Sequence, residues 1–300
     1  YSLRQGIEDG CLAPYRVLRV GINVDLEGWR PEDGKTDKSG NLVDDRIYNT
    51  RDFDRHLVID ERTATVAKKL TDYLRGFDRF AKTIVFCVDI DHAQRMRSAL
   101  VNLNSDLVQE NSKYIMQITG DNEEGKRELD NFTDPEQRYP VIATTSELMT
   151  TGIDAITCKV IVLDANINSM TRFKQIIGRG TRINEDYNKS YFTILDFRNV
   201  TDLFADPDFD GEPIQIKVVG SEDEIPPFEL PDGDAFPEPD DENPLIPPLR
   251  TPEGDPDQVS EPRMKVYVNG VDVSILISRE VYFDQHGKPI TTSLKDHTRE

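Results

Sequence analysis

Apolar and polar positions alternate in blocks between residues 55 and 211. Val66, Leu70 and Leu74 recur with helical spacing, which predicts an amphipathic helix. The run Thr83–Val88 is short and apolar, as in a strand buried on both faces of a parallel sheet. Both patterns repeat along the segment. Helices are predicted at residues 61–74, 91–103, 122–132 and 169–178, and strands at residues 83–88, 114–118, 140–143, 159–164 and 191–196.

Alternating strands and helices of these lengths predict βαβ units, and therefore an α/β fold with a mostly parallel sheet. We expect one more strand earlier in the chain, at residues 16–25. The stretch that follows, residues 27–51, is polar and glycine-rich, which favours an insertion loop. We therefore place a connecting region at residues 1–54 and the α/β domain at residues 55–212.

The chain changes character after the α/β domain. Residues 201–262 hold nineteen Asp and Glu against two basic residues, and thirteen of the eighteen prolines. Proline interrupts helices and central strands, and so acidic a segment buries little apolar surface. We predict an acidic, proline-rich linker at residues 213–262.

The last forty residues carry a strand pattern. Lys265–Ile275 alternates between apolar and polar residues around Asn269-Gly270, a strong hairpin signal. A second turn is expected at residues 284–287. We therefore predict a small β-hairpin element at residues 263–300.

Charge and cysteine content narrow the class of protein. The net charge of −20 argues against nucleic-acid binding, but the acidic segment accounts for −17 of it and says little about the rest. No apolar run is long enough for a membrane span, and no signal-peptide pattern is visible. Three widely separated cysteines exclude a disulfide framework and fit the reducing cytoplasm.

The sharpest chemical signal lies at residues 175–182, Gln-Ile-Ile-Gly-Arg-Gly-Thr-Arg. On a helix, Gln175, Arg179 and Arg182 would share one face, and Gly178 and Gly180 would keep it thin enough for a ligand to approach. Two guanidiniums suit an anion with delocalised charge, such as a transferring phosphoryl group. The same residues also fit a solvated basic helix end.

Hydroxyl side chains cluster upstream, where Thr144 and Thr145 follow a predicted strand. The carboxyl ends of parallel strands are where open α/β sheets bind ligands, and hydroxyls bind phosphates without carrying charge. Gly152 and Asp154 end this segment. A helix N-cap with a glycine turn explains the same residues.

The sequence does not support a phosphate-binding loop, a nuclease site or a metal site. Gly34-Lys35-Thr36 follows Gly28 by the wrong spacing for a phosphate-binding loop, so we interpret it as an ordinary loop. The Pro-Asp pairs at residues 231 and 256 lack the acid-x-Lys of a nuclease site. The four histidines are scattered, and we predict no metal site.

In order and spacing, residues 83–93, 143–154 and 175–182 together resemble motifs IV, V and VI of the second RecA-like domain of superfamily 2 helicases. The flanking sequence resembles, more specifically, the motor (R) subunit of type I restriction enzymes. That likeness spans nearly the whole chain and includes residues 5–18, 25–55, 195–198, 203–211 and 265–275.

The resemblance implies a role for each motif. Arg179 and Arg182 would act as arginine fingers on an ATP held, with Mg²⁺, mainly by a first RecA-like domain. Gln175, Gly152 and Asp154 would belong to the nucleotide-binding surface. Thr144 and Thr145 would contact DNA phosphates.

The resemblance also implies a setting. Hydrolysis would drive translocation on double-stranded DNA, methyltransferase and specificity subunits would be the partners, and a nuclease domain outside this chain would cut. The chain alone would be inactive.

Two alternatives stay open. One is the second motor domain of another superfamily 2 DNA helicase. The other is a non-catalytic interaction module that uses the acidic arm to engage a basic partner.

Overall fold

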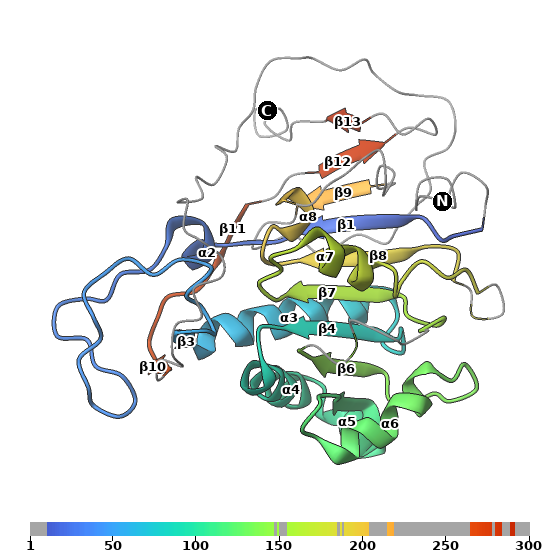
Figure 1. Ribbon diagram of the computed structural model, residues 1–300, viewed down its shortest axis with the longest axis horizontal. Helices are drawn as coiled ribbons and strands as arrows, with labels where there is room; N and C mark the ends of the chain where they lie inside the picture. The colour runs from blue at the N-terminus through green and yellow to red at the C-terminus, as the bar shows by residue number, and fades with distance from the viewer. Residues whose placement is uncertain are drawn as a thin grey trace, which may run out of the picture.

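A nine-stranded sheet forms the centre of the protein, with strand order β13-β12-β9-β1-β8-β7-β4-β6-β5 (Figure 1). The computed structural model describes residues 11–146, 149, 155–184, 187, 189–203, 215–218, 265–277, 280–283 and 289–291. The strands from β9 to β5 in this order run parallel to one another, whereas β12 is antiparallel to both of its neighbours, β9 and β13. Their bounds are β1 (Tyr15–Arg19), β4 (Thr83–Cys87), β5 (Ile115–Gln117), β6 (Ile142–Thr145), β7 (Val160–Asp164), β8 (Phe192–Asp196), β9 (Gln215–Val218), β12 (Glu280–Phe283) and β13 (Pro289–Thr291).

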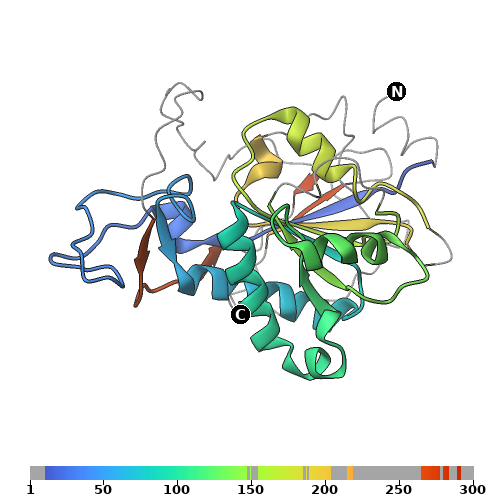
Figure 2. The same ribbon diagram turned by 60° about the horizontal axis from the view of Figure 1, so that its bottom comes forward.

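Helices cover both faces of this sheet, as Figure 2 shows from a view along its layers. One apolar core lies between the sheet and α3 (Asp60–Phe77), α4 (Ile90–Leu103) and α5 (Ser105–Glu110). The other lies between the sheet and α6 (Glu123–Thr133), α7 (Met170–Ile177) and α8 (Val200–Leu203). A single 3₁₀ turn, η1 (Ser112–Tyr114), precedes β5. The predicted α/β fold with a parallel sheet is confirmed, and the helices and strands predicted between residues 61 and 196 all form.

The strand expected at residues 16–25 is only partly correct. β1 is followed by the short β2 (Gly21–Ile22) and then by a helix, α2 (Asn23–Glu27). The helix turns the Asp25 side chain into the protein, where it meets Arg62. A continued strand would have broken this buried ion pair. We call residues 23–54 the insert; it extends to one side of the sheet (Figure 1, left).

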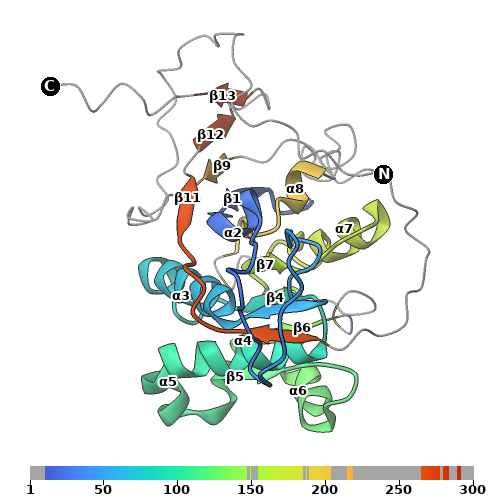
Figure 3. The ribbon, with the colours of Figure 1, turned by 90° about the vertical axis from the view of Figure 1, so that its left-hand side faces the viewer.

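The hairpin predicted around Asn269-Gly270 is wrong. β10 (Val266–Val268) pairs in parallel with β3 (Leu57–Ile59), and β11 (Ile275–Ile277) pairs antiparallel with β2. Gly270 does adopt the left-handed conformation, with φ of 70°. The two halves bury Val268, Val271 and Ile275 against the rest of the protein instead of against each other. We call residues 265–277 the strap; Figure 3 shows it beside the insert.

Three further strands, β9, β12 and β13, extend the main sheet beyond β1. β9 begins at Gln215, inside the segment predicted as linker, and pairs with β1 in the main sheet. β12 and β13 pair with each other across the turn predicted at residues 284–287, although the turn itself lies outside the described residues.

Lys82 is buried at the amino end of β4, where its Nζ donates a hydrogen bond of 2.7 Å to the Pro140 carbonyl. Burial lowers the pKa of Lys82 from 10.5 to about 8. Between those two values the unfolded chain holds a proton that the folded chain has lost, so Lys82 makes stability rise with pH.

We expect this rise to be about 3 kcal/mol between pH 8 and 10.5. It should appear as the difference in free energy of unfolding between the wild type and Lys82→Met, measured in urea at several pH values. Lys126→Met, at an exposed position on α6, should track the wild type across the same range. Parallel curves for the wild type and Lys82→Met would contradict the shift.

Candidate functional site

The predicted arginine segment follows α7, whose first turn is capped by the Ser169 side chain. The helix ends at Ile177, earlier than the predicted motif requires. Gly178 keeps a helical φ and ψ, and then the amides of Arg179 and Gly180 donate to the carbonyls of Ile176 and Ile177, three residues back. The tighter winding means that Gln175, Arg179 and Arg182 do not lie on one face of a helix, which corrects that prediction.

The turn that carries the arginines is nevertheless well held. The Thr181 hydroxyl donates to the Gly178 carbonyl at 3.0 Å, and the Thr181 carbonyl accepts a 2.7 Å bond from the amide of Ala13. Gln175 and Arg182 are exposed to solvent, and Arg179 is half-buried. The Gln175 amide on α7 and the Arg182 guanidinium after the turn are therefore open to solvent, whereas the Nε atom of Arg179 is buried.

Gly180 has a packing role and does not thin a ligand-binding face as predicted. A Cβ atom at this position would lie 2.3 Å from the ring of Phe192 on β8. Only glycine lets the turn pack so closely on the sheet, because a methyl group needs more space than this gap offers.

The two predicted phosphate-binding threonines differ in environment. Thr144 is fully buried, and its hydroxyl donates a 2.9 Å hydrogen bond to the Ala93 carbonyl on α4. Thr145 is equally buried, but its hydroxyl has no hydrogen-bond partner in the part of the chain that the structure describes. Thr145 is thus the candidate with unused hydrogen-bonding capacity. Gly152 and Asp154, the other two predicted residues of this motif, lie outside the described residues.

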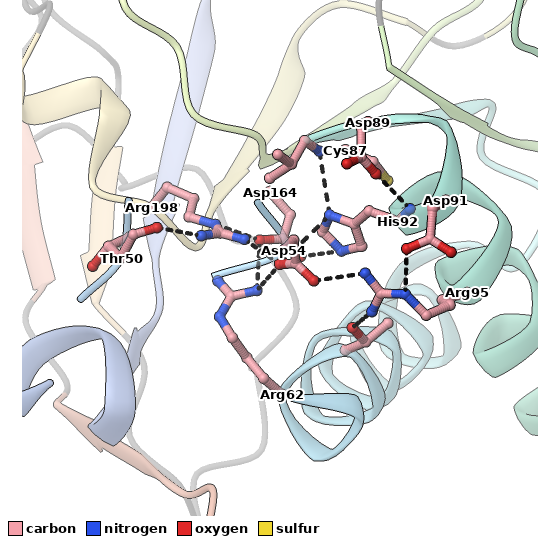
Figure 4. A network of polar contacts seen from close by, with 12 residues as sticks. Thr50, Asp54, Arg62, Cys87, Asp89, Asp91, His92, Arg95, Asp164 and Arg198 are labelled. Atoms are coloured by element: carbon pink, nitrogen blue, oxygen red, sulfur yellow. Dashed lines mark hydrogen bonds and ion pairs between the residues drawn. The ribbon is translucent and has the colours of Figure 1, made fainter. Parts of the chain in front are cut away.

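A buried ionic network fills the carboxyl edge of the sheet next to β7 (Figure 4). Three aspartates face three arginines, so the formal charges balance. Asp164 is the last residue of β7, and Arg198 follows the end of β8. The other members come from the insert and from the helices of one face: Asp25, Asp54, Arg62 on α3 and Arg95 on α4.

Arg62 joins the insert to the sheet. Its Nε and Nη2 bind the two oxygens of Asp25, each at 2.8 Å, and its Nη1 donates to Asp164 Oδ1 at 2.9 Å. All three side chains are almost completely buried. Burial by itself lowers the pKa of the Arg62 guanidinium, but Asp164 and Asp25 outweigh it and hold that pKa well above its usual range.

Arg198 binds three acceptors with three different nitrogens. Its Nε donates to Asp164 at 2.8 Å, Nη1 donates to the Thr50 carbonyl at 2.8 Å, and Nη2 donates to Asp54 at 2.6 Å. Asp54 adopts a left-handed backbone conformation, with φ of 66°, which few residues other than glycine tolerate. The network therefore holds a strained residue at its centre.

Opposing charges decide the protonation of the network. Burial raises the pKa of Asp164, but Arg62 and Arg198 outweigh it and keep this pKa well below 3.8. Burial raises the pKa of Asp54, but the attraction of Arg198, Arg62 and Arg95 outweighs it and holds this pKa below its ordinary value. Burial beside these two carboxylates raises the pKa of the Cys87 thiol well above 9.0, so Cys87 stays protonated.

His92 lies within the network and is completely buried. Its Nδ1 accepts a 3.2 Å hydrogen bond from the amide of Val88, and its Nε2 lies 3.4 Å from Asp164 Oδ2. No group of three or more His, Cys, Asp or Glu side chains among the described residues is arranged to bind a metal. His92, which is 0% exposed, is packed in the core.

Sequence reasoning missed this network. Its members are single residues far apart in the chain: Asp164 and Arg198 are 34 positions apart, and Arg62 and Asp164 are 102 apart. The one available signal was that Asp164 and Asp196 each end an apolar strand, so a charged residue has to be accommodated at the sheet edge.

Of the remaining candidates, the Pro-Asp pairs at residues 231 and 256 lie outside the described residues. Gly34-Lys35-Thr36 lies in a loop of the insert, where Lys35 Nζ donates to the Asn269 carbonyl of the strap at 2.7 Å. Within the described part of the chain, no helix is both long and apolar enough to cross a membrane.

Comparison with known proteins gives a consistent picture. The chain is 54% identical over 312 aligned residues to the type I restriction enzyme EcoAI endonuclease subunit of Escherichia coli, which covers 100% of this chain and 38% of that protein. It is 33% identical to the EcoKI endonuclease subunit of Escherichia coli (strain K12), over 52% of this chain and 13% of that protein. No family model matches. The chain thus spans well under half the length of the curated relatives it matches.

A solved structure agrees with these relatives. The fragment structure of an HsdR subunit assigned to a type I restriction enzyme from Vibrio vulnificus YJ016 superposes with a TM-score of 0.60. It is 47% identical in sequence and covers 73% of this chain and 39% of its own. These similarities confirm the resemblance predicted from the sequence, together with the RecA-like fold.

Proposed function

Since this chain is homologous to part of the endonuclease (R) subunit of type I restriction enzymes, we propose that it is the second motor domain of an ATP-dependent DNA translocase. The identity to the EcoAI endonuclease subunit over the entire chain is the observation that carries this proposal. It favours a restriction motor over another superfamily 2 helicase, and over a non-catalytic interaction module. The divisions expected at residues 54 and 212 cut through the central sheet, because β1 and β9 pair with each other within it and β1 also pairs with β8. We therefore propose a motor domain that includes both strands, and we keep the division at residue 262 as a proposal.

ATP would be the substrate, shared with a preceding RecA-like domain. The exposed Arg182 and the half-buried Arg179 suit a phosphate group, because guanidiniums bind such oxygens through paired hydrogen bonds. Gln175, Gly152 and Asp154 would complete this domain's part of the nucleotide-binding surface. Mg²⁺ would be held mainly by the preceding domain.

Double-stranded DNA would run past the carboxyl edge of the sheet. Of the two threonines, Thr145 is the better candidate for a phosphate contact, because the hydroxyl of Thr144 is already bonded to the Ala93 carbonyl. We place methyltransferase and specificity subunits as partners, the nuclease in another part of the protein, and the site of action in the cytoplasm.

The test is ATP hydrolysis with and without linear duplex DNA. A protein that carries this chain together with a first RecA-like domain should hydrolyse ATP faster when DNA is present, whereas the 300-residue chain alone should show no turnover. DNA-stimulated hydrolysis by the chain alone, or none by the longer protein, would contradict the proposal.

A further inference from the structure

The ion pair between Asp164 and Arg198 brackets the segment that carries the arginine turn. Asp164 is the last residue before the connection to α7, and Arg198 lies just after β8, the strand that follows the turn. Their side chains meet at 2.8 Å, both almost completely buried. The ion pair therefore fixes to each other the two ends of a chain segment that are 34 positions apart in sequence.

Little slack exists between Asp164 and α7. Five residues connect them, and two of these, Ala165 and Ile167, are buried in the apolar core. α7 itself is only eight residues long. A shift of Asp164 would therefore pass directly to the helix, and through it to Arg179 and Arg182.

The Arg198 guanidinium can fix the directions of its acceptors as well as neutralise their charge. It uses three nitrogens on three acceptors that come from β7 and from the insert. A planar guanidinium fixes these directions at once, whereas a lysine ammonium supplies the charge without the geometry. Buried ion networks of this kind contribute less to stability than apolar packing would. What this network provides is a fixed arrangement of the side chains that it joins.

We propose that Arg198 and Asp164 are positioning residues for the arginine turn, an inference that rests on the proposed function. They hold α7 in place, so that the Arg182 guanidinium reaches the phosphate of ATP in the orientation that catalysis needs. Because an arginine finger acts in the transition state, misplacing it lowers kcat and leaves the KM for ATP nearly unchanged.

The test compares Arg198→Lys with Arg95→Lys in the protein that carries both motor domains. Arg95 is the matched control: it also binds Asp54, at 2.8 Å, and makes further bonds to Asp91 and Thr63, but it makes none to Asp164. Arg198→Lys should lower kcat for DNA-stimulated ATP hydrolysis roughly 10-fold or more, because small misplacements of catalytic groups cost up to about 100-fold. The KM for ATP should stay within about 2-fold in both variants, and Arg95→Lys should keep its kcat.

The measurement is made well below the melting temperature of each variant, with the folded fraction checked by circular dichroism. Equal kcat values per folded molecule for Arg198→Lys and Arg95→Lys would overturn the positioning role. If Arg198→Lys does not fold, the isosteric Asp54→Asn takes its place, because it weakens the bond between Arg198 and the insert. Asp54→Asn should then lower kcat relative to Arg95→Lys. Equal kcat values for these two variants would also overturn the positioning role. A wild type without DNA-stimulated turnover would instead overturn the proposed function, so the two failures are distinguishable.

Discussion

Replacing Arg182 by alanine should lower DNA-stimulated ATP turnover by roughly 10³–10⁵-fold, the effect of an arginine finger in phosphoryl transfer. Arg182 is exposed, and the turn before it is held by the Thr181 hydroxyl and by the amide of Ala13. Truncating its side chain removes a guanidinium without opening a cavity. We therefore expect the loss in kcat with an unchanged circular dichroism spectrum and melting temperature.

The control for this experiment is Lys126→Ala, which removes an exposed cation from α6. It should leave ATP turnover at the wild-type level. Wild-type turnover in Arg182→Ala would withdraw the finger assignment from Arg182, and wild-type turnover in Arg179→Ala as well would move the interaction-module alternative to the front.

Replacing Arg62 by methionine should destabilise the fold by about 3–5 kcal/mol, the cost of removing one partner from a buried ion pair. Arg62 binds Asp25 through two hydrogen bonds and Asp164 through a third. Without it, two carboxylates stay buried with too little positive charge. Urea denaturation followed by circular dichroism measures the free energy of unfolding.

Arg30 provides a matched control. It binds Asp45 through the same two nitrogens, at 2.6 and 2.9 Å, but both side chains are about 60% exposed. Because solvent screens this exposed pair, Arg30→Met should lower the free energy of unfolding far less than Arg62→Met does. Similar losses for Arg62→Met and Arg30→Met would contradict the burial argument.

The same network makes stability depend on acid. The folded pKa of Asp164 lies well below 3.8, so its carboxylate contributes stability above this value and loses the contribution as the pH falls further. Arg62→Met weakens the attraction that lowers this pKa. The variant should accordingly lose less of its remaining stability than the wild type does between pH 5 and pH 2.

Local sequence patterns predicted most of the domain but not its long-range pairings. The repeats of apolar spacing located β4, α4 and β7 within one residue and α3 within three, because each depends on neighbours in the chain. Asn269-Gly270 predicted a hairpin from equally local information. There, the two halves of the expected hairpin pair with the distant strands β3 and β2 instead of with each other.

The candidate site shows the same division. The identity of Arg179 and Arg182 was visible in the sequence, and so was the end of the helix to within one residue. The tighter winding after it, which takes the two arginines off the helix face of Gln175, was not visible. Asp25, Asp54 and Asp164 gave no joint signal, because only the folded chain brings them together.

The pairing of the strap with the insert also sets the order in which the protein is completed on the ribosome. Gly270 of the strap bonds to Glu61, at the start of α3, across 209 positions in sequence. At about 5–20 residues per second, the ribosome needs roughly 10–40 s to bridge that distance. During this interval β3 has an open edge, which is the kind of surface that recruits other strands. Until the strap is made, this edge of the nascent chain is open to pairing with other strands.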